Sequence, residues 1–201
     1  MTAPRNHIHP IYDRTVPQAE KEALLGQRGM VFWLTGLSGA GKSTLAVQTD
    51  RRLHTAGHLT KVLDGDNIRH RINANLGFSL AERQENIRRV AEIARLFREA
   101  GVITICSFIC PTIEIRAMAR DIIGPDYYRE IHVSAGLATC EARDPKGLYR
   151  KARAGVIPDF TGIHSPYENP PHPDLRLETD KLTVEEASTR LVQYVVQEAI
   201  P

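Results

Sequence analysis

The feature that most constrains this sequence is a glycine-rich stretch that joins an apolar run to a helix-compatible segment. The stretch reads Thr35-Gly36-Leu37-Ser38-Gly39-Ala40-Gly41-Lys42-Ser43-Thr44, and the apolar run before it reads Met30-Val31-Phe32-Trp33-Leu34. This is the spacing of a P-loop, in which glycines let backbone N–H groups converge on phosphate oxygens. The start of the following helix adds a partial positive charge. We therefore expect a strand, a phosphate cradle and a helix in succession.

Two side chains of this loop have separate expected roles. Lys42 should reach the β- and γ-phosphates of a nucleoside triphosphate, and the Ser43 hydroxyl should be a ligand of Mg²⁺. The expected nucleotide-binding residues are Gly36, Ser38, Gly39, Ala40, Gly41, Lys42, Ser43 and Thr44.

Composition and charge narrow the class of protein. The 201 residues, 42% hydrophobic and 25% charged, suit one globular domain. A formal net charge of +2 gives no electrostatic case for binding nucleic acid or an anionic membrane. Cys106, Cys110 and Cys140 lack metal-ligand spacing and an even number, which favours reduced thiols in a cytoplasmic protein. The start lacks the apolar core of a signal peptide, and the run 102–110 is too short to span a bilayer.

Alternating strand-like and helix-like segments predict an α/β fold. The pattern 102–108 is continuous and β-branched, as in a strand buried on both faces of a parallel sheet. The expected architecture is a P-loop NTPase fold, with a mostly parallel central sheet, helices on both faces and a mobile cationic lid. We expect strands at 30–34, 60–63, 102–108, 129–133 and 175–178, and helices at 18–25, 43–56, 79–100, 114–122, 137–142 and from 183 onward.

A pair of carboxylates follows the second expected strand, in Asp64-Gly65-Asp66-Asn67. Ligand chemistry in an open α/β sheet gathers at such strand ends, although the same residues are also common in turns. Asp66 is the candidate to orient or deprotonate an acceptor hydroxyl. Further along, Ser79 and Glu82 form a capping box, which puts Arg83 and Asn86 on one face of the first helical turns, where an anion could bind.

A P-loop alone does not identify a reaction, since GTPases, transport ATPases and small-molecule kinases share it. The guanine-reading sequence Asn-Lys-x-Asp is missing, and the chain is short for a motor or transporter ATPase. A small-molecule kinase is therefore favoured. Its domains are expected to be an N-terminal arm at 1–28, which holds three prolines, and a P-loop kinase domain at 29–201.

A cation-rich segment interrupts the α/β alternation at 143–171. Arg143, Lys146, Arg150, Lys151 and Arg153 stand there among glycines and five prolines. A charge run is usually a solvated surface, but phosphoryl transfer needs cations over the triphosphate and exclusion of water. We interpret the segment as the lid.

The whole set of motifs resembles the adenylylsulfate kinase family, whose members phosphorylate adenosine 5′-phosphosulfate at its 3′-hydroxyl. The resemblance spans roughly 26–181. It rests on the P-loop, on Leu63-Asp64-Gly65-Asp66-Asn67 with Arg69-His70, on Leu76-Gly77-Phe78-Ser79, on Glu85-Asn86-Ile87-Arg88-Arg89-Val90, on Arg143-Asp144-Pro145-Lys146-Gly147-Leu148-Tyr149, on Lys151-Ala152-Arg153-Ala154-Gly155 and on Phe160-Thr161-Gly162-Ile163.

The resemblance implies an enzyme that uses ATP and Mg²⁺ to make 3′-phosphoadenylyl sulfate and ADP in sulfate assimilation, as a cytoplasmic homodimer. Phe78 and Phe160 would sandwich the adenine of the acceptor, although packing within the protein is an alternative for both rings. Asp66 and Lys42 would be catalytic. The implied acceptor-binding residues are Asp64, Arg69, Phe78, Arg83, Asn86, Ile109, Lys146, Leu148 and Phe160.

Four positions depart from the family pattern. Cys110 stands where the family usually has serine, so a phosphorylated serine has no role here and direct in-line transfer is expected. Thr112 and Ile113 replace an aromatic or histidine followed by arginine, and His164 replaces an acidic residue. Two alternatives therefore stay open: a related kinase for another nucleotide-linked anion, and a nucleotide-binding regulatory subunit without turnover. Whether the product would serve sulfate reduction or sulfonation is also open.

Overall fold

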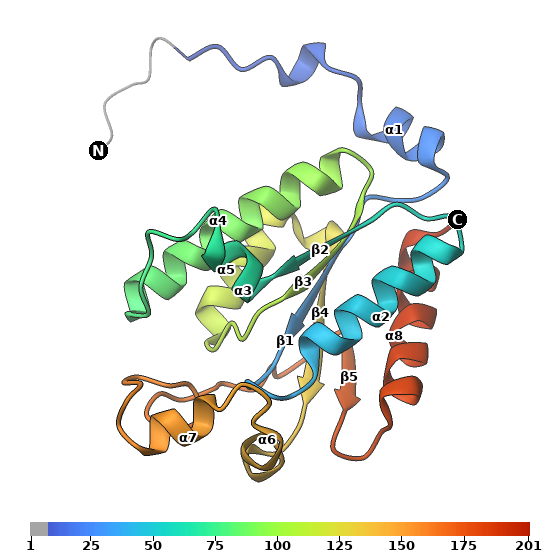
Figure 1. The fold of residues 1–201 in the computed structure, drawn as a ribbon. Helices are drawn as coiled ribbons and strands as arrows, with labels where there is room; N and C mark the ends of the chain where they lie inside the picture. The colour runs from blue at the N-terminus through green and yellow to red at the C-terminus, as the bar shows by residue number, and fades with distance from the viewer. Residues whose placement is uncertain (1–7) are drawn as a thin grey trace.

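The computed structural model describes residues 8–201, which form a central parallel sheet covered by helices (Figure 1). The strand order is β2-β3-β1-β4-β5, and every pairing between neighbouring strands is parallel. The predicted fold class is confirmed. The strands are β1 (Val31–Thr35), β2 (Thr60–Asp64), β3 (Ile103–Ser107), β4 (Tyr128–Ser134) and β5 (Leu175–Glu178).

Two pairs of helices cover opposite faces of the sheet, and the other helices lie around its ends. The helices are α1 (Gln18–Leu25), α2 (Lys42–Thr55), α3 (Gly65–His70), α4 (Leu80–Glu99), α5 (Ile113–Ile123), α6 (Leu137–Arg143), α7 (Leu148–Arg153) and α8 (Val184–Ala199). Short 3-10 turns occupy Tyr12–Arg14 and Pro125–Tyr127.

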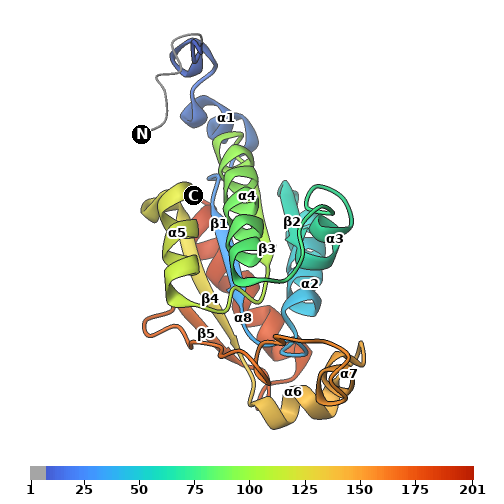
Figure 2. The same ribbon diagram turned by 90° about the vertical axis from the view of Figure 1, so that its left-hand side faces the viewer.

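Successive side chains of β1 point to opposite faces of the sheet, and the hydrophobic core forms one cluster on each face. Phe32 and Leu34 pack with α2 and α8 on one face, whereas Val31 and Trp33 pack with α4 and α5 on the other. Figures 1 and 2 show the two helix pairs on either side of the strands. The two-sided burial explains why β1 and β3 are apolar without interruption, as the sequence pattern indicated.

Helix ends follow the capping signals. The Ser79 hydroxyl accepts from the Glu82 N–H, and the Glu82 carboxylate accepts from the Ser79 N–H, so the predicted capping box opens α4. Thr183 and Glu186 open α8 in the same way. Two helices were not predicted, α3 and α7. Asp64 caps α3 by accepting from the Asp66 N–H at 3.1 Å, so a sequence that is typical of a turn begins a helix instead.

The amino-terminal segment is attached to the sheet edge through α1 and the residues after it. Buried Gln27 donates from Nε2 to the carbonyls of Leu59 and Gly101, both at 2.8 Å, and accepts from the Leu59 N–H. Arg98 of α4 donates to the Gln18 side chain at 2.7 Å. Residues 8–16 lead away from this contact (Figure 1), and residues 1–7 of the predicted arm lie outside the described part of the chain. No helix within residues 8–201 is long and apolar enough to cross a membrane.

Candidate active site at the carboxyl ends of the strands

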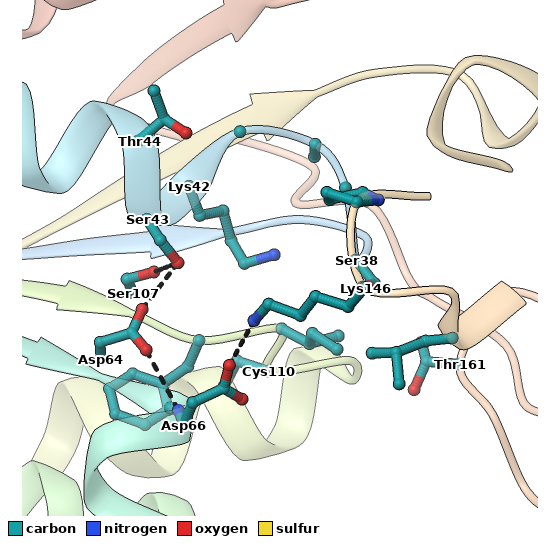
Figure 3. A pocket seen from close by; sticks show the side chains of 18 of the residues that line it. Ser38, Lys42, Ser43, Thr44, Asp64, Asp66, Ser107, Cys110, Lys146 and Thr161 are labelled. Carbon is teal, nitrogen blue, oxygen red and sulfur yellow. Dashed lines mark hydrogen bonds and ion pairs between the residues drawn. The ribbon is translucent and has the colours of Figure 1, made fainter. Parts of the chain in front are cut away.

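A cavity of about 1050 Å³ opens where the carboxyl ends of β1, β2 and β3 meet the 143–161 segment. Its volume lies at the upper end of the range of about 300–1,000 Å³ that is common for small-molecule pockets. Figure 3 shows its centre, where Lys42, Asp64, Asp66 and Lys146 converge. Of the predicted site residues, all but Gly36 line the cavity.

The P-loop runs from the end of β1 into the amino terminus of α2. A Cβ at Gly36 would lie 2.3 Å from the Val133 carbonyl oxygen, so this position admits only glycine. Gly39 and Gly41 have φ values of 75° and 101°, which carry the chain through the left-handed region before the helix begins at Lys42. The N–H groups that begin α2 are therefore presented to the cavity, as the sequence predicted.

Lys42 is buried beneath this loop. Its Nζ donates to the carbonyl oxygens of Gly36 and Leu37, both at 2.8 Å. Burial lowers the Lys42 pKa from 10.5 to about 8, against the attraction of nearby Asp64 and Asp66. Two carbonyls of the P-loop thus orient the Lys42 ammonium group, and the fraction of Lys42 that is charged changes with pH around 8.

Three oxygen atoms meet at the start of α2. The Ser43 hydroxyl donates to Asp64 Oδ2 at 2.7 Å and lies 3.2 Å from the Ser107 hydroxyl (Figure 3). Oxygen atoms of carboxylate and hydroxyl groups are the ligands that Mg²⁺ prefers. Within residues 8–201 no group of three or more His, Cys, Asp or Glu side chains could hold a metal ion by itself. This donor set suits a cation that completes its coordination with phosphate oxygens and water.

Asp66 projects from the first turn of α3 and pairs with Lys146, which comes from the segment before α7 (Figure 3). Both side chains are largely exposed to the cavity. The contact brings the candidate base, just after the end of β2, next to a cation of the predicted lid.

Two arginines organise the far end of the cavity. Arg83 donates to the Phe78 carbonyl at 2.7 Å, to Thr161 Oγ1 at 2.6 Å and to the Asp159 carbonyl at 2.5 Å. Arg69 donates to the Gly77 carbonyl at 2.7 Å, and its guanidinium carbon lies 4.4 Å from the centre of the Phe78 ring. Burial lowers the pKa of both arginines, yet guanidinium groups remain charged at any physiological pH.

The two predicted stacking rings differ in environment. Phe78 is 64% exposed at the mouth of the cavity, whereas Phe160 is 8% exposed. Phe160 packs edge-on against Tyr149, with 5.0 Å between ring centroids. Most of the Phe160 side chain is therefore packed within the protein, which was the alternative raised from the sequence. The residue still lines the cavity.

The remaining predicted acceptor residues are held by the fold. Asn86 is buried in α4 and its Oδ1 accepts from Asn73 Nδ2 at 3.0 Å. The Ile109 carbonyl accepts from Thr35 Oγ1 at 2.7 Å. Leu148 begins α7 and packs on the core around Phe160.

The predicted lid contains the helix α7, and only some of its cationic side chains line the cavity. Arg143 and Lys146 line the cavity, and Arg143 also donates to the carbonyls of Gly39 and Thr179. Arg150, Lys151 and Arg153 do not line it, and Arg153 pairs with Glu141 instead. The helix α7 within this segment was missed because glycines and prolines on either side obscured a run of only six residues.

The four departures have identifiable surroundings. Cys110 is buried, has a φ of 45° and, through burial, a pKa raised to about 12, which makes its thiol inert. Thr112 caps α5 by accepting from the Ile115 N–H, and Ile113 is exposed. His164 Nδ1 accepts from the Phe160 N–H at 3.4 Å.

Sequence reasoning missed several polar residues of the site. Ser107, Thr161 and Thr179 line the cavity, and Asn73 supports Asn86. Ser107 had a usable signal, because it ends a buried strand next to the P-loop strand, and ligands collect at such ends. Asn73 had none, since its role depends on the approach of two segments thirteen residues apart.

Comparisons with known proteins agree on one family. A family model described as "Adenylylsulphate kinase" matches residues 28–178. An "Adenylyl-sulfate kinase" of Bacteroides thetaiotaomicron is 54% identical over 192 residues, which cover 96% of each chain.

Solved structures give the same result. An APS kinase of Mycobacterium tuberculosis in complex with AMPPNP and APS has a TM-score of 0.80 and 44% identity, covering 85% of this chain and 98% of that one. A hexameric APS kinase from Thiobacillus denitrificans has a TM-score of 0.64 and 30% identity, covering 86% of this chain and 29% of that one.

Proposed function

We propose that this chain, which belongs to the adenylylsulphate kinase family, transfers the γ-phosphoryl group of ATP to the 3′-hydroxyl of adenosine 5′-phosphosulfate. The products are 3′-phosphoadenylyl sulfate and ADP, within sulfate assimilation. The observation that carries the proposal is a single cavity with a P-loop at one end and the Phe78 and Arg83 cluster at the other. Asp66 also lines this cavity, where it pairs with Lys146 (Figure 3).

The donor half is supported by the P-loop and by its lysine. Backbone N–H groups at the start of α2 would hold the phosphates, and Lys42 would bind the β- and γ-phosphate oxygens. Lys42 now donates to two loop carbonyls, so its ammonium group needs only a small movement to turn toward phosphate. Arg143, which also lines the cavity, adds a second cation.

Ser43, Asp64 and Ser107 would hold Mg²⁺, directly or through water, because their oxygen atoms converge next to the P-loop. When bound with ATP, the ion neutralises charge on the β- and γ-phosphates. Asp64 already caps α3 and accepts from Ser43, so the same carboxylate links the P-loop to the helix that carries Asp66.

The acceptor half is supported by cations and rings that suit a flat base with an anionic chain. Phe78 and Phe160 would contact the adenine, while Arg69, Arg83 and Asn86 would bind the ribose and phosphosulfate. Arg69 stacks on the Phe78 ring, and Phe78 is still 64% exposed, so it has surface available to contact a base. The backbone of Ile109 and the side chain of Leu148 would complete the wall.

Asp66 would accept the proton of the 3′-hydroxyl as its oxygen attacks the γ-phosphorus. The bond from that phosphorus to the β,γ-bridging oxygen breaks, and ADP leaves with the electron pair. Lys146, now paired with Asp66, lies where it would stabilise the charge on the transferring group. Cys110 takes no part, because its buried thiol carries a high pKa.

A panel of acceptors tests the proposal. Purified protein with ATP and Mg²⁺ should release ADP with adenosine 5′-phosphosulfate and much less with adenosine 5′-monophosphate or other nucleotide-linked anions. ADP release at the background rate with every acceptor would favour a regulatory nucleotide-binding subunit. A clear preference for a different nucleotide-linked anion would replace the proposed acceptor.

We propose a cytoplasmic homodimer as the working form. Three free, buried cysteines support a reducing compartment. A molar mass of about twice 22.5 kDa in sedimentation of the purified chain would agree with the dimer, and any other mass would correct it.

A further inference from the structure

Two segments that are distant in sequence are fastened together behind the acceptor end of the cavity. The 109–113 loop supplies Ile109, Cys110 and Pro111 to the cavity wall. The 166–170 strap follows the cavity-lining Phe160 and runs along this loop. The Glu168 N–H donates to the Pro111 carbonyl at 2.8 Å, and Glu168 Oε2 accepts from the Ile113 N–H at 2.6 Å.

Arg116 of α5 joins the loop, the strap and the sheet. The residue is 3% exposed, and its Nε lies 2.7 Å from Glu130 Oε1 on β4. Its Nη1 donates to the Cys110 carbonyl at 2.9 Å, and its Nη2 donates to the Glu168 carbonyl at 2.8 Å. One planar guanidinium therefore binds three separate chain segments, a geometry that the ammonium of lysine cannot reproduce.

A second set of contacts runs through Tyr167 of the strap. Its hydroxyl lies 3.0 Å from Thr35 Oγ1, which donates to the Ile109 carbonyl at 2.7 Å. Burial raises the Tyr167 pKa to about 12, so the hydroxyl stays protonated at physiological pH. The carbonyls of both Ile109 and Cys110 are thus held by donors behind the loop.

The backbone at the centre of this arrangement is strained. Cys110 has a φ of 45°, a left-handed backbone conformation that is unfavourable for a residue with a Cβ. The Arg116 hydrogen bond to its carbonyl offsets part of this cost. Strain of this kind persists only where the surrounding contacts hold it, and here it lies in a wall of the cavity.

We propose that Arg116 and Glu168 are positioning residues that hold the 109–113 loop in the shape that receives the acceptor nucleotide. This inference rests on the proposed function. Glu168 makes its side-chain contact on the loop and not on the P-loop, so its loss affects acceptor binding and leaves donor binding intact. Because Glu168 is exposed, replacing it leaves the core undisturbed.

Glu168→Ala is the test, with Glu114→Ala as the matched control. Glu114 is also exposed and acidic at the start of α5, but it makes no side-chain hydrogen bond to the strap within residues 8–201. Steady-state rates are measured with adenosine 5′-phosphosulfate varied at saturating ATP, and then with ATP varied at saturating adenosine 5′-phosphosulfate. Loss of one hydrogen bond predicts a KM for the phosphosulfate raised at least about fivefold in Glu168→Ala, with the KM for ATP within about twofold. The Glu114→Ala control should change neither KM.

Two further variants separate positioning from general stability. Glu168→Gln keeps an oxygen that can accept from the Ile113 N–H, so its KM for the phosphosulfate should be close to the wild-type value. Arg116→Lys keeps the positive charge beside Glu130 but cannot donate to the Cys110 and Glu168 carbonyls at the same time. Provided that circular dichroism shows a folded protein, this variant should also raise the KM for the phosphosulfate. Equal KM values for the phosphosulfate in Glu168→Ala and wild type would overturn this inference but not the proposed function. Wild-type protein without turnover of the phosphosulfate would instead refute the proposed function on which the inference rests.

Discussion

Affinity for ATP should fall as the pH rises past 8, because the buried lysine of the P-loop loses its proton there. Lys42 is 8% exposed, and burial lowers its pKa from 10.5 to about 8. Only the ammonium form attracts the phosphates, and the phosphates in turn stabilise that form. The apparent Kd should therefore vary inversely with the charged fraction of Lys42 in the free protein.

The size of the effect follows from the pKa. With a value of about 8, roughly three quarters of the Lys42 side chains are charged at about pH 7.5 and roughly a tenth at about pH 9. The apparent Kd should then rise about eightfold between these two pH values. Phosphate groups lose their last proton at about pH 6, so the charge of the ligand changes little over this interval.

Equilibrium titration with a non-hydrolysable ATP analogue and Mg²⁺ measures this dependence. Lys42→Arg is the control, since a guanidinium stays charged at both pH values; its affinity is expected to be weaker but insensitive to pH. An unchanged wild-type Kd between the two pH values would refute the reasoning. So would an equal rise in Lys42→Arg, because the titrating group would then be another one.

Other expectations concern the reaction and the fold. Asp66→Asn should lower kcat at least about a hundredfold in single-turnover assays and leave the Kd of ATP within about twofold; full activity would reassign Asp66 to structure. Burial lowers the His132 pKa from 6.5 to about 4, so the unfolded chain binds the proton first, and stability is lost as the pH falls through this interval. Urea unfolding should show that loss in wild type and a smaller one in His132→Phe. Ser79→Ala should cost about 1 kcal/mol of unfolding free energy by removing the cap of α4, and an unchanged value would contradict that role for the cap.

Local patterns were sufficient for most of the fold. The strand before the P-loop, the capping boxes at Ser79 and Thr183 and the β-branched run of β3 each carry their signal within a few residues. The helix α3 was not predicted, because its cap, Asp64, occurs in a sequence that is equally typical of a turn. The Asp64 carboxylate also accepts from Ser43, a residue 21 positions away, and no local pattern reports that contact.

The candidate site also contains residues that local sequence predicts and residues whose placement depends on the fold. Donor residues form one continuous motif, so spacing alone predicted them. The acceptor residues were assigned through family resemblance, and physical reasons for their placement appear only in three dimensions. Arg69 stacks on Phe78, and Arg83 ties the start of α4 to Asp159. Arg116 was not identified from the sequence, because nothing in the sequence relates it to Glu168.

The position of the transferred phosphate tests the central claim most directly. Nuclear magnetic resonance of the product made from ATP and adenosine 5′-phosphosulfate can show which ribose proton is coupled to the new phosphorus. The proposed reaction, in which the cavity-lining Asp66 accepts the proton of the 3′-hydroxyl, predicts coupling to the 3′ proton and one ADP for each product. Phosphate at another position, or ADP formed without a phosphorylated nucleotide, would contradict the account.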